Sequence, residues 1–174
     1  MELWSSGVLS APDPSTPRLQ YSITPVLGER LQLTRAEKTF IRAARVAHLA
    51  TADAAGQPLV VPICFAFDGK LFFSPIDEKP KRTAPNRLKR LRNIAANPKV
   101  SLVIDRYDED WLRLAYVLVK GTAKILQRGK RHQRGVQLLR RKYPQYRRMA
   151  IDRRPMIVIT PKEFRSWGNL SPRS

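Results

Sequence analysis

The chain has 174 residues, of which 43% are hydrophobic, and its 33 Lys and Arg against 14 Asp and Glu give a formal net charge of +19 at pH 7. This length and composition suit one domain with a single core, and the charge implies an anionic ligand or partner. With Cys64 as the one cysteine, an internal disulfide is excluded, and the apolar run around it is too short to cross a bilayer. The N-terminus lacks the pattern of a secretory signal. We therefore expect a cytoplasmic protein.

The N-terminal segment, residues 1–33, differs in composition from the rest of the chain. Residues 1–30 hold four prolines and five serines without a sustained apolar period, so we expect an extended arm that is ordered only against the body or a neighbouring subunit. The folded domain is predicted to span residues 34–174. It should begin with a helix, because Thr34 and Glu37 form a capping-box pattern in front of Phe40 and Ile41.

Patterns of period two predict strands over residues 45–51, 58–67 and 70–75. Asp68-Gly69 stands between the last two strands, and this pair favours a two-residue hairpin turn in which both central residues have positive φ. We therefore predict a meander of three strands, each antiparallel to the one before it.

Helical spacing returns after Pro85, with Leu88, Leu91 and Ile94 on one face, and Asn97-Pro98 ends this helix. Further strands are expected at residues 99–105, 114–126 and 155–160, with a helix over residues 128–149. About six mostly antiparallel strands with two or three helices predict a mainly β protein, a small barrel packed by helices.

Side chains typical of catalytic centres are sparse. The two histidines are His48, inside a predicted strand, and His132, in a basic run where we expect it to be solvated. Neither forms a metal or nucleophile pattern with Cys64, and the glycine-rich nucleotide-binding motifs are absent from the sequence. An enzyme built from this chain would have to take its chemistry from a cofactor.

The basic stretch of residues 77–98 carries seven Lys and Arg around the start of the predicted helix. A helix start adds free backbone N–H groups and the positive end of the helix dipole, so the stretch predicts a phosphate cradle at the end of the strand that contains Ser74. A solvated helix face is the alternative interpretation.

Three stretches in a fixed order resemble one protein family: FIRAARVAHLATADAAGQPLVVPICFAFDGKLFFS, then DEKPKRT, then RLRNIAANPKVSLVIDRYDEDW. The family is that of the pyridoxamine 5′-phosphate oxidase-like split β-barrel proteins, and within it the branch of F-420-dependent oxidoreductases, where F-420 is a deazaflavin hydride carrier. The resemblance covers about residues 34–168. It implies a six-stranded antiparallel split β-barrel and a homodimer with two cofactor sites at the subunit interface.

The resemblance also implies a site. The cofactor phosphate would be held by residues that match Ser74, Lys79, Lys81, Arg82, Arg90, Arg92 and Asn93, and the ring would lie against the strand that matches Val60, Pro62 and Ile63. Trp111 and Trp167 are candidate lids over the ring of the partner chain, or else core and interface residues. No catalytic side chain and no metal ligand is implied, because hydride transfer from a flavin-type ring needs orientation and a dry pocket more than an acid or base.

We therefore expect an oxidoreductase that transfers a hydride from F-420 to a small electron-poor acceptor. FMN is the alternative cofactor, because both carry a phosphate, although the carboxylate-rich tail of F-420 better suits the surplus of Lys and Arg. The alternative from another class is a nucleic-acid-binding module, because residues 128–154 carry eleven Lys or Arg against one Asp. A third interpretation is a protein that stores the cofactor without efficient turnover.

Overall fold

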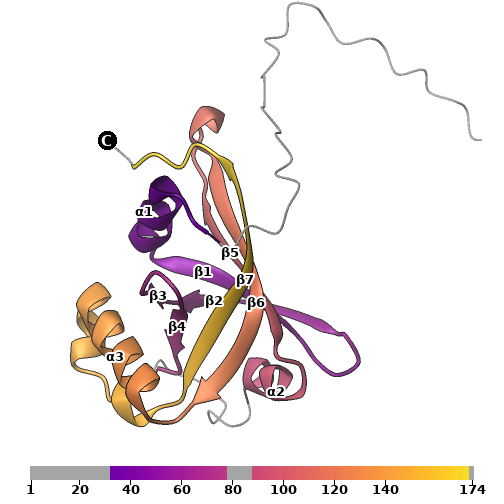
Figure 1. Cartoon of the computed structure of the whole chain (residues 1–174), viewed down its shortest axis with the longest axis vertical. Coiled ribbons are helices and arrows are strands. Elements are labelled where there is room, and N and C mark those ends of the chain that lie inside the picture. The colour runs from indigo at the N-terminus through magenta and orange to yellow at the C-terminus, as the bar shows by residue number, and fades with distance from the viewer. Residues whose placement is uncertain (1–31, 78–87, 173–174) are drawn as a thin grey trace, which may run out of the picture.

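The computed structural model describes residues 32–77 and 88–172. Within this part of the chain, seven strands form one antiparallel sheet in the order β2-β1-β5-β6-β7-β4-β3 (Figure 1). The strands are β1 (Val46–Ala52), β2 (Pro58–Cys64), β3 (Ala66–Phe67), β4 (Phe72–Pro75), β5 (Lys99–Arg106), β6 (Ala115–Leu126) and β7 (Met156–Gly168). The predicted mainly β, antiparallel barrel with flanking helices is confirmed.

Three helices and three short 3₁₀ turns complete the described fold. The helices are α1 (Arg35–Ala43), α2 (Lys89–Ala96) and α3 (Lys130–Lys142), and the turns are η2 (Trp111–Arg113), η3 (Pro144–Arg147) and η4 (Ile151–Arg153). None of the helices in residues 32–77 and 88–172 has the length and apolar content needed to cross a bilayer.

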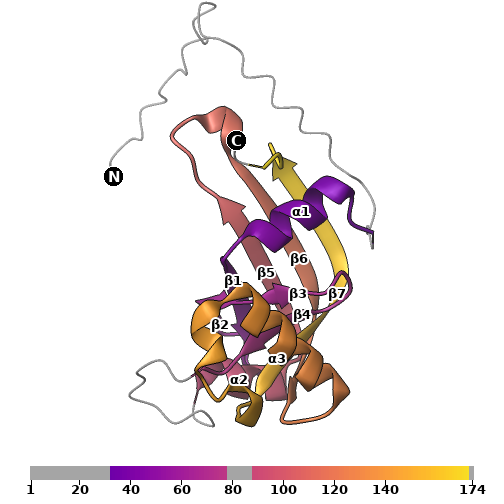
Figure 2. The same ribbon diagram turned by 90° about the vertical axis from the view of Figure 1, so that its left-hand side faces the viewer.

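Helix α1 starts with the predicted capping box. The Thr34 hydroxyl accepts from the Glu37 N–H at 3.2 Å, and the Glu37 carboxylate accepts from the Thr34 N–H at 2.7 Å. Glu37 is 1% exposed and also accepts a 2.6 Å hydrogen bond from the Ser166 hydroxyl of β7. One buried carboxylate therefore both caps α1 and ties it to the sheet that it crosses in Figure 2.

The predicted three-strand meander is wrong beyond its second strand. Residues 58–67 do not form one strand, because the chain breaks at Phe65 into β2, which pairs with β1, and β3, which pairs with β4 at the other end of the strand order. The Tyr143 hydroxyl explains the break. It accepts from the Phe65 N–H at 3.1 Å and lies 2.9 Å from the Phe65 carbonyl, so both backbone groups of this residue bond outside the sheet.

The hairpin between β3 and β4 lies where Asp68-Gly69 predicted it, but its turn is of another kind. Gly69 has a φ of +103°, whereas Asp68 keeps a negative φ. The Asp68 carboxylate instead accepts from the N–H groups of Lys70 at 2.8 Å and Leu71 at 2.7 Å. A side chain therefore closes a four-residue connection, as Asp often does in turns.

The last strand is longer than predicted and gives the sheet its length. β7 runs on to Gly168 and pairs with β6 from Ala115↔Gly168 to Leu126↔Met156, with a shift in register at Lys120/Gly121. Strand alternation predicted an end at residue 160, whereas β7 continues through the PKEFRSW segment, residues 161–167. The shift in register lies near the start of this segment.

Alternation along the strands divides the sheet into two faces. The inward side chains of β1, β5 and β6 fill the core, and among them Ala47, Leu102 and Val117 are 0% exposed. The outward row of the same strands places His48 beside Val103, and Val103 beside Leu118. Within the described residues, the outward face of these strands has no helix packed on it.

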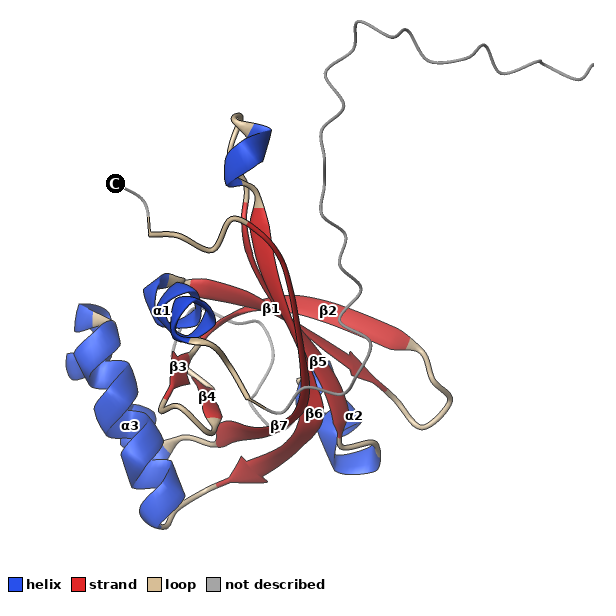
Figure 3. Ribbon diagram, turned by 45° about the horizontal axis from the view of Figure 1, so that its top comes forward, coloured by secondary structure: helices blue, strands red, loops and turns tan. Residues whose placement is uncertain are grey.

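Helix α3 covers β3 and β4 on the outside of the barrel (Figures 1 and 3). Val136, Leu139, Tyr143 and Tyr146 pack there against Phe73 and Val158 in a second apolar cluster. His132, predicted to be solvated, is 2% exposed, and its Nε2 lies 2.8 Å from the Arg154 carbonyl, so it belongs to the buried face of α3. The helix ends at Lys142, before the predicted end at residue 149.

Lys142, the last residue of α3, has a buried ammonium group. Its Nζ has no hydrogen-bond partner and lies 4.0 Å from the centroid of the Phe65 ring. Burial, and then the nearby charge of Arg45, lower the pKa of Lys142 to about 8. The folded protein therefore holds the Lys142 proton less tightly than the unfolded chain does.

Replacing Lys142 with Met should stabilise the protein at pH 7 by roughly 1–3 kcal/mol, because each unit of pKa depression corresponds to about 1.4 kcal/mol. The pKa of Lys142 is lower in the folded protein, so the wild-type free energy of unfolding should rise between about pH 8 and the unfolded value of 10.5. The Lys142→Met variant should lose that rise. Urea unfolding at several pH values up to about 9.5 measures both effects.

The matched control is Arg141→Met, because Arg141 is the exposed neighbour of Lys142 on α3. It should leave the pH dependence unchanged. A wild-type stability that stays flat or falls over this pH range, or equal changes in both variants, would contradict the assignment of an uncompensated buried charge to Lys142.

Candidate cofactor site

The N-terminus of α2 forms the basic end of the candidate site. Its N-cap, Leu88, makes no side-chain capping bond, and the first turn contains no acidic residue. The backbone N–H groups at this helix end are therefore free of a competing side-chain anion from α2 itself. A helix start of this kind favours a phosphate or carboxylate group.

Arg90 is the central basic residue of this end. Its guanidinium is partly buried, and its Nε is a buried donor without a hydrogen-bond partner. Burial lowers the pKa of Arg90, and the carboxylate of Asp77 acts in the opposite direction. A buried N–H without an acceptor is costly in a folded protein, so an anion placed there would satisfy it. The residues present thus fit a ligand phosphate.

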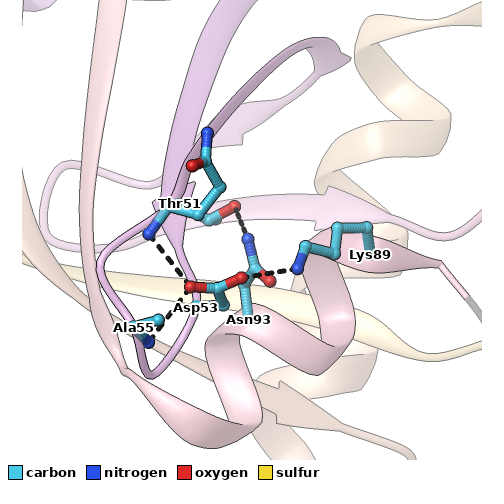
Figure 4. A network of polar contacts seen from close by, with 6 residues as sticks. Thr51, Asp53, Ala55, Lys89 and Asn93 are labelled. Carbon is cyan, nitrogen blue, oxygen red and sulfur yellow. Dashed lines mark hydrogen bonds and ion pairs between the residues drawn. The ribbon is translucent and has the colours of Figure 1, made fainter.

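Asn93 lies one helical turn after Arg90 and is 1% exposed. Its amide nitrogen donates to the Thr51 hydroxyl of β1 at 3.1 Å, and its Oδ1 is buried without a partner. The neighbouring Lys89 pairs with Asp53 at 2.6 Å (Figure 4), and this hydrogen bond is the main reason why the pKa of Asp53 is lowered. These contacts fix α2 against the β1–β2 turn.

The ring-contact candidates divide between two faces of β2. Val60 is 59% exposed, and Pro62, two residues on, is also exposed on the outward face. The side chain of Ile63 is 7% exposed and belongs to the core. A planar ring could therefore lie on Val60 and Pro62, while Ile63 could meet it only through its backbone.

The phosphate candidates are only partly brought together. Ser74 is 2% exposed on β4, and two residues after that strand Asp77 lies near enough to Arg90 to affect its charge. The fold thus brings the end of β4 to the start of α2. Arg92 is exposed on α2. Lys79, Lys81 and Arg82, together with Pro85, lie outside the described residues.

Two residues of this region were not predicted from the sequence. Asp77 accepts a 3.0 Å hydrogen bond from the hydroxyl of Tyr146, which is fully buried on η3. Burial raises the pKa of Tyr146 above its usual range, and Cys64 and Asp77 raise it further. Tyr146 therefore stays a neutral donor that holds the Asp77 carboxylate beside Arg90. Asp77 opens the basic stretch in the sequence, but its Tyr146 partner is 69 residues away.

A hollow of about 570 Å³ lies elsewhere, between α1, the end of β5 and the segment around Leu170. Its lining includes none of the seven candidate cofactor-binding residues that the structure describes. The lining of this hollow is largely apolar, whereas the buried Arg90 Nε–H at the start of α2 lacks an acceptor that an anionic ligand would supply.

Comparison with known proteins shows which family has a similar sequence. The family model described as pyridoxamine 5′-phosphate oxidase matches residues 33–168. A 5a,11a-dehydrotetracycline/5a,11a-dehydrooxytetracycline reductase of Streptomyces rimosus is 32% identical over 146 residues, which cover 79% of this chain and 84% of that protein.

Two solved structures share the fold. The heme storage protein HutZ of Vibrio cholerae has a TM-score of 0.62 at 16% identity, over 79% of this chain and 97% of that one. An F-420 reductase has a TM-score of 0.51 at 24% identity, over 74% of this chain and 94% of that one. From the family match and the reductase relative, the chain belongs to the pyridoxamine 5′-phosphate oxidase family.

Proposed function

We propose that this protein is an oxidoreductase that uses the deazaflavin F-420 to reduce a small electron-poor acceptor. The observation that carries the proposal is Arg90, a partly buried guanidinium with an unpartnered Nε at the start of α2. Family membership and a reductase relative at 32% identity support a redox role for the ligand bound there.

The choice of F-420 over FMN rests on charge. Both cofactors offer a phosphate to Arg90, but F-420 also carries a tail of several carboxylates. A chain with a net charge of +19 suits the more anionic ligand. Lys79, Lys81 and Arg82 stay candidates for the same phosphate on the family resemblance alone.

When bound, F-420 supplies a hydride to the acceptor. The residues of this chain bind and orient: Arg90 holds the anionic end through its free Nε–H, Asn93 fixes α2 through its bond to Thr51, and Val60 and Pro62 present an apolar surface to the ring. We assign no catalytic acid or base, because hydride transfer from a flavin-type ring depends on orientation more than on a protein acid or base. Orientation and exclusion of water are the expected contributions of the protein.

We further propose a homodimer in which a second copy covers the outward face of the sheet. On that face Tyr116 is 38% exposed and stacks on Trp167 with ring centroids 5.9 Å apart. Val60 and Pro62 share the face, so a second copy would enclose the ring site. Trp111 is 59% exposed on η2, at the tip of the β5–β6 hairpin that stands clear of the body in Figure 3, and is a candidate lid for the partner's site.

The cofactor proposal is tested by fluorescence titration with F-420 and with FMN. Arg90→Gln removes the charge at similar volume and should weaken F-420 binding roughly 10- to 100-fold, because hydrogen bonds to charged groups contribute about 1.5–3 kcal/mol. Arg42→Gln, an exposed site on α1, is the control and should bind F-420 like the wild type. Unchanged affinity in Arg90→Gln would refute the site assignment. Tighter binding of FMN than of F-420 would refute the cofactor assignment.

The dimer proposal predicts that Tyr116→Asp dissociates the protein and loses F-420 binding with it, because a carboxylate would be desolvated at the interface. Sedimentation velocity of the wild type should show a dimer, and Thr39→Asp, an exposed site on α1, should leave it intact. A monomeric wild type, or a Tyr116→Asp variant that remains a dimer, would show that this face is not the interface.

A further inference from the structure

Helix α3 and the segments on either side of it carry a cationic surface that includes none of the candidate cofactor-binding residues. We define this basic surface by its eight exposed cations: Arg128, Lys130, Arg131, Arg134, Arg141, Arg147, Arg148 and Arg153. The only carboxylate in residues 128–154 is Asp152, and it pairs with Arg140 at 2.6 Å. The eight cations therefore face solvent without a neutralising partner from this stretch.

The basic surface is held rigidly by the fold. The opposite side of α3 is buried through Val136 and Leu139. The segment after α3 turns back along the helix, as shown by hydrogen bonds from Arg147 Nε to the Arg140 carbonyl at 3.3 Å and between His132 and the Arg154 carbonyl at 2.8 Å. The backbone of α3 and of the returning segment thus lies on one side of the molecule, at the lower left of Figure 1.

Spacing along α3 suits a repeating anion. Lys130, Arg134 and Arg141 lie on the solvent-facing side of the helix, opposite its buried face. At 1.5 Å per residue they span about 16 Å along the axis. Seven of the eight cations of the basic surface are arginines, whose planar forks bind phosphate through two parallel hydrogen bonds.

The other exposed residues near the basic surface help to distinguish a membrane, a single strand and a duplex as its partner. The exposed residues of α3 are Lys130, Arg131, Gln133, Arg134, Gln137 and Arg141, so the helix presents no apolar side chain for insertion into a lipid headgroup layer. The two aromatic residues of the region, Tyr143 and Tyr146, are 2% and 0% exposed, which leaves no platform for stacking the bases of a single strand.

We propose that the basic surface binds the phosphate backbone of duplex nucleic acid, without sequence specificity and separately from the cofactor site. The binding is electrostatic, so it depends on the release of counterions from the duplex and weakens steeply with salt. It requires neither F-420 nor the acceptor, and it gives a function to the charge of residues 128–154.

The test is fluorescence anisotropy with a labelled random-sequence DNA duplex of about 20 base pairs, in KCl from about 50 to 200 mM. The wild type should bind with a dissociation constant near the micromolar range at the lowest salt, and a plot of log K against log salt should have a slope of about −4. The variant Lys130→Ala/Arg134→Ala/Arg141→Ala should reduce that slope by about 2 to 3 units and weaken binding at least 10-fold, because each phosphate contact contributes about 0.9 to the slope.

The matched control is Arg35→Ala/Lys70→Ala/Lys162→Ala, which removes the same charge from exposed positions outside the basic surface. It should bind the duplex nearly as tightly as the wild type. An equal loss in both variants, or no duplex binding at the lowest salt, would overturn the proposal. Tighter binding to vesicles of phosphatidylserine than to the duplex would replace it with a membrane partner.

Titration of the same triple variant with F-420 separates this proposal from the proposed function. Unchanged F-420 affinity beside weakened duplex binding is the expected result. If F-420 affinity falls as far as duplex affinity does, the basic surface serves the cofactor tail and the nucleic-acid proposal is overturned. If the wild type binds duplex but not F-420, the proposed function fails while this inference stands.

Discussion

The Tyr143 hydroxyl makes the contact on which the arrangement of this barrel depends. It bonds to the backbone of Phe65 and lies 2.7 Å from the Arg45 carbonyl, so one buried phenol joins the start of β1 to the break between β2 and β3. Because the chain leaves β2 at that point, β3 and β4 pair at the opposite end of the strand order. The segment after β4 is thereby directed to the start of α2, where Asp77 faces Arg90.

Buried cations without full compensation recur at the two helices that flank this junction. Lys142 on α3 has the Phe65 ring beside its Nζ and no acceptor, whereas Arg90 on α2 has Asp77 nearby and one free donor. The physical difference is that Arg keeps its charge at any ordinary pH, while a buried Lys can release its proton. Arg90 is therefore suited to hold a permanent anion, and Lys142 is a source of pH-dependent stability.

Local sequence patterns predicted the features that local forces determine. The capping box of Thr34 and Glu37, the alternation in β1 and β5, and the end of α2 at Asn97-Pro98 all depend on residues within a few positions of each other. The break at Phe65 could not be predicted, because its cause lies 78 residues away in Tyr143. His132 was misplaced for a similar reason: neighbouring charges suggested solvent, but the buried face of α3 and the Arg154 carbonyl enclose it.

In the candidate site, too, residues within sequence motifs could be selected, whereas those placed by distant contacts could not. Arg90, Asn93, Val60 and Pro62 could be selected because the family motifs include them, and whether they bind the cofactor is still a prediction. Asp77 and its Tyr146 partner escaped selection, since no motif links a carboxylate at the end of β4 to a phenol after α3. Burial of Ile63 and exposure of Val60 depend on which face of β2 turns inward, and one residue of register decides that.

We propose that the unpartnered Arg90 Nε–H donates a hydrogen bond to the phosphate of the cofactor. The most direct measurement is a ¹H–¹⁵N spectrum of the arginine Nε groups, with Arg90 assigned through the Arg90→Gln variant, recorded before and after addition of F-420. The Arg90 Nε–H resonance should move strongly downfield and become protected from exchange, while that of Arg42 should not move. An Arg90 resonance that is unchanged at saturating F-420 would contradict the proposal.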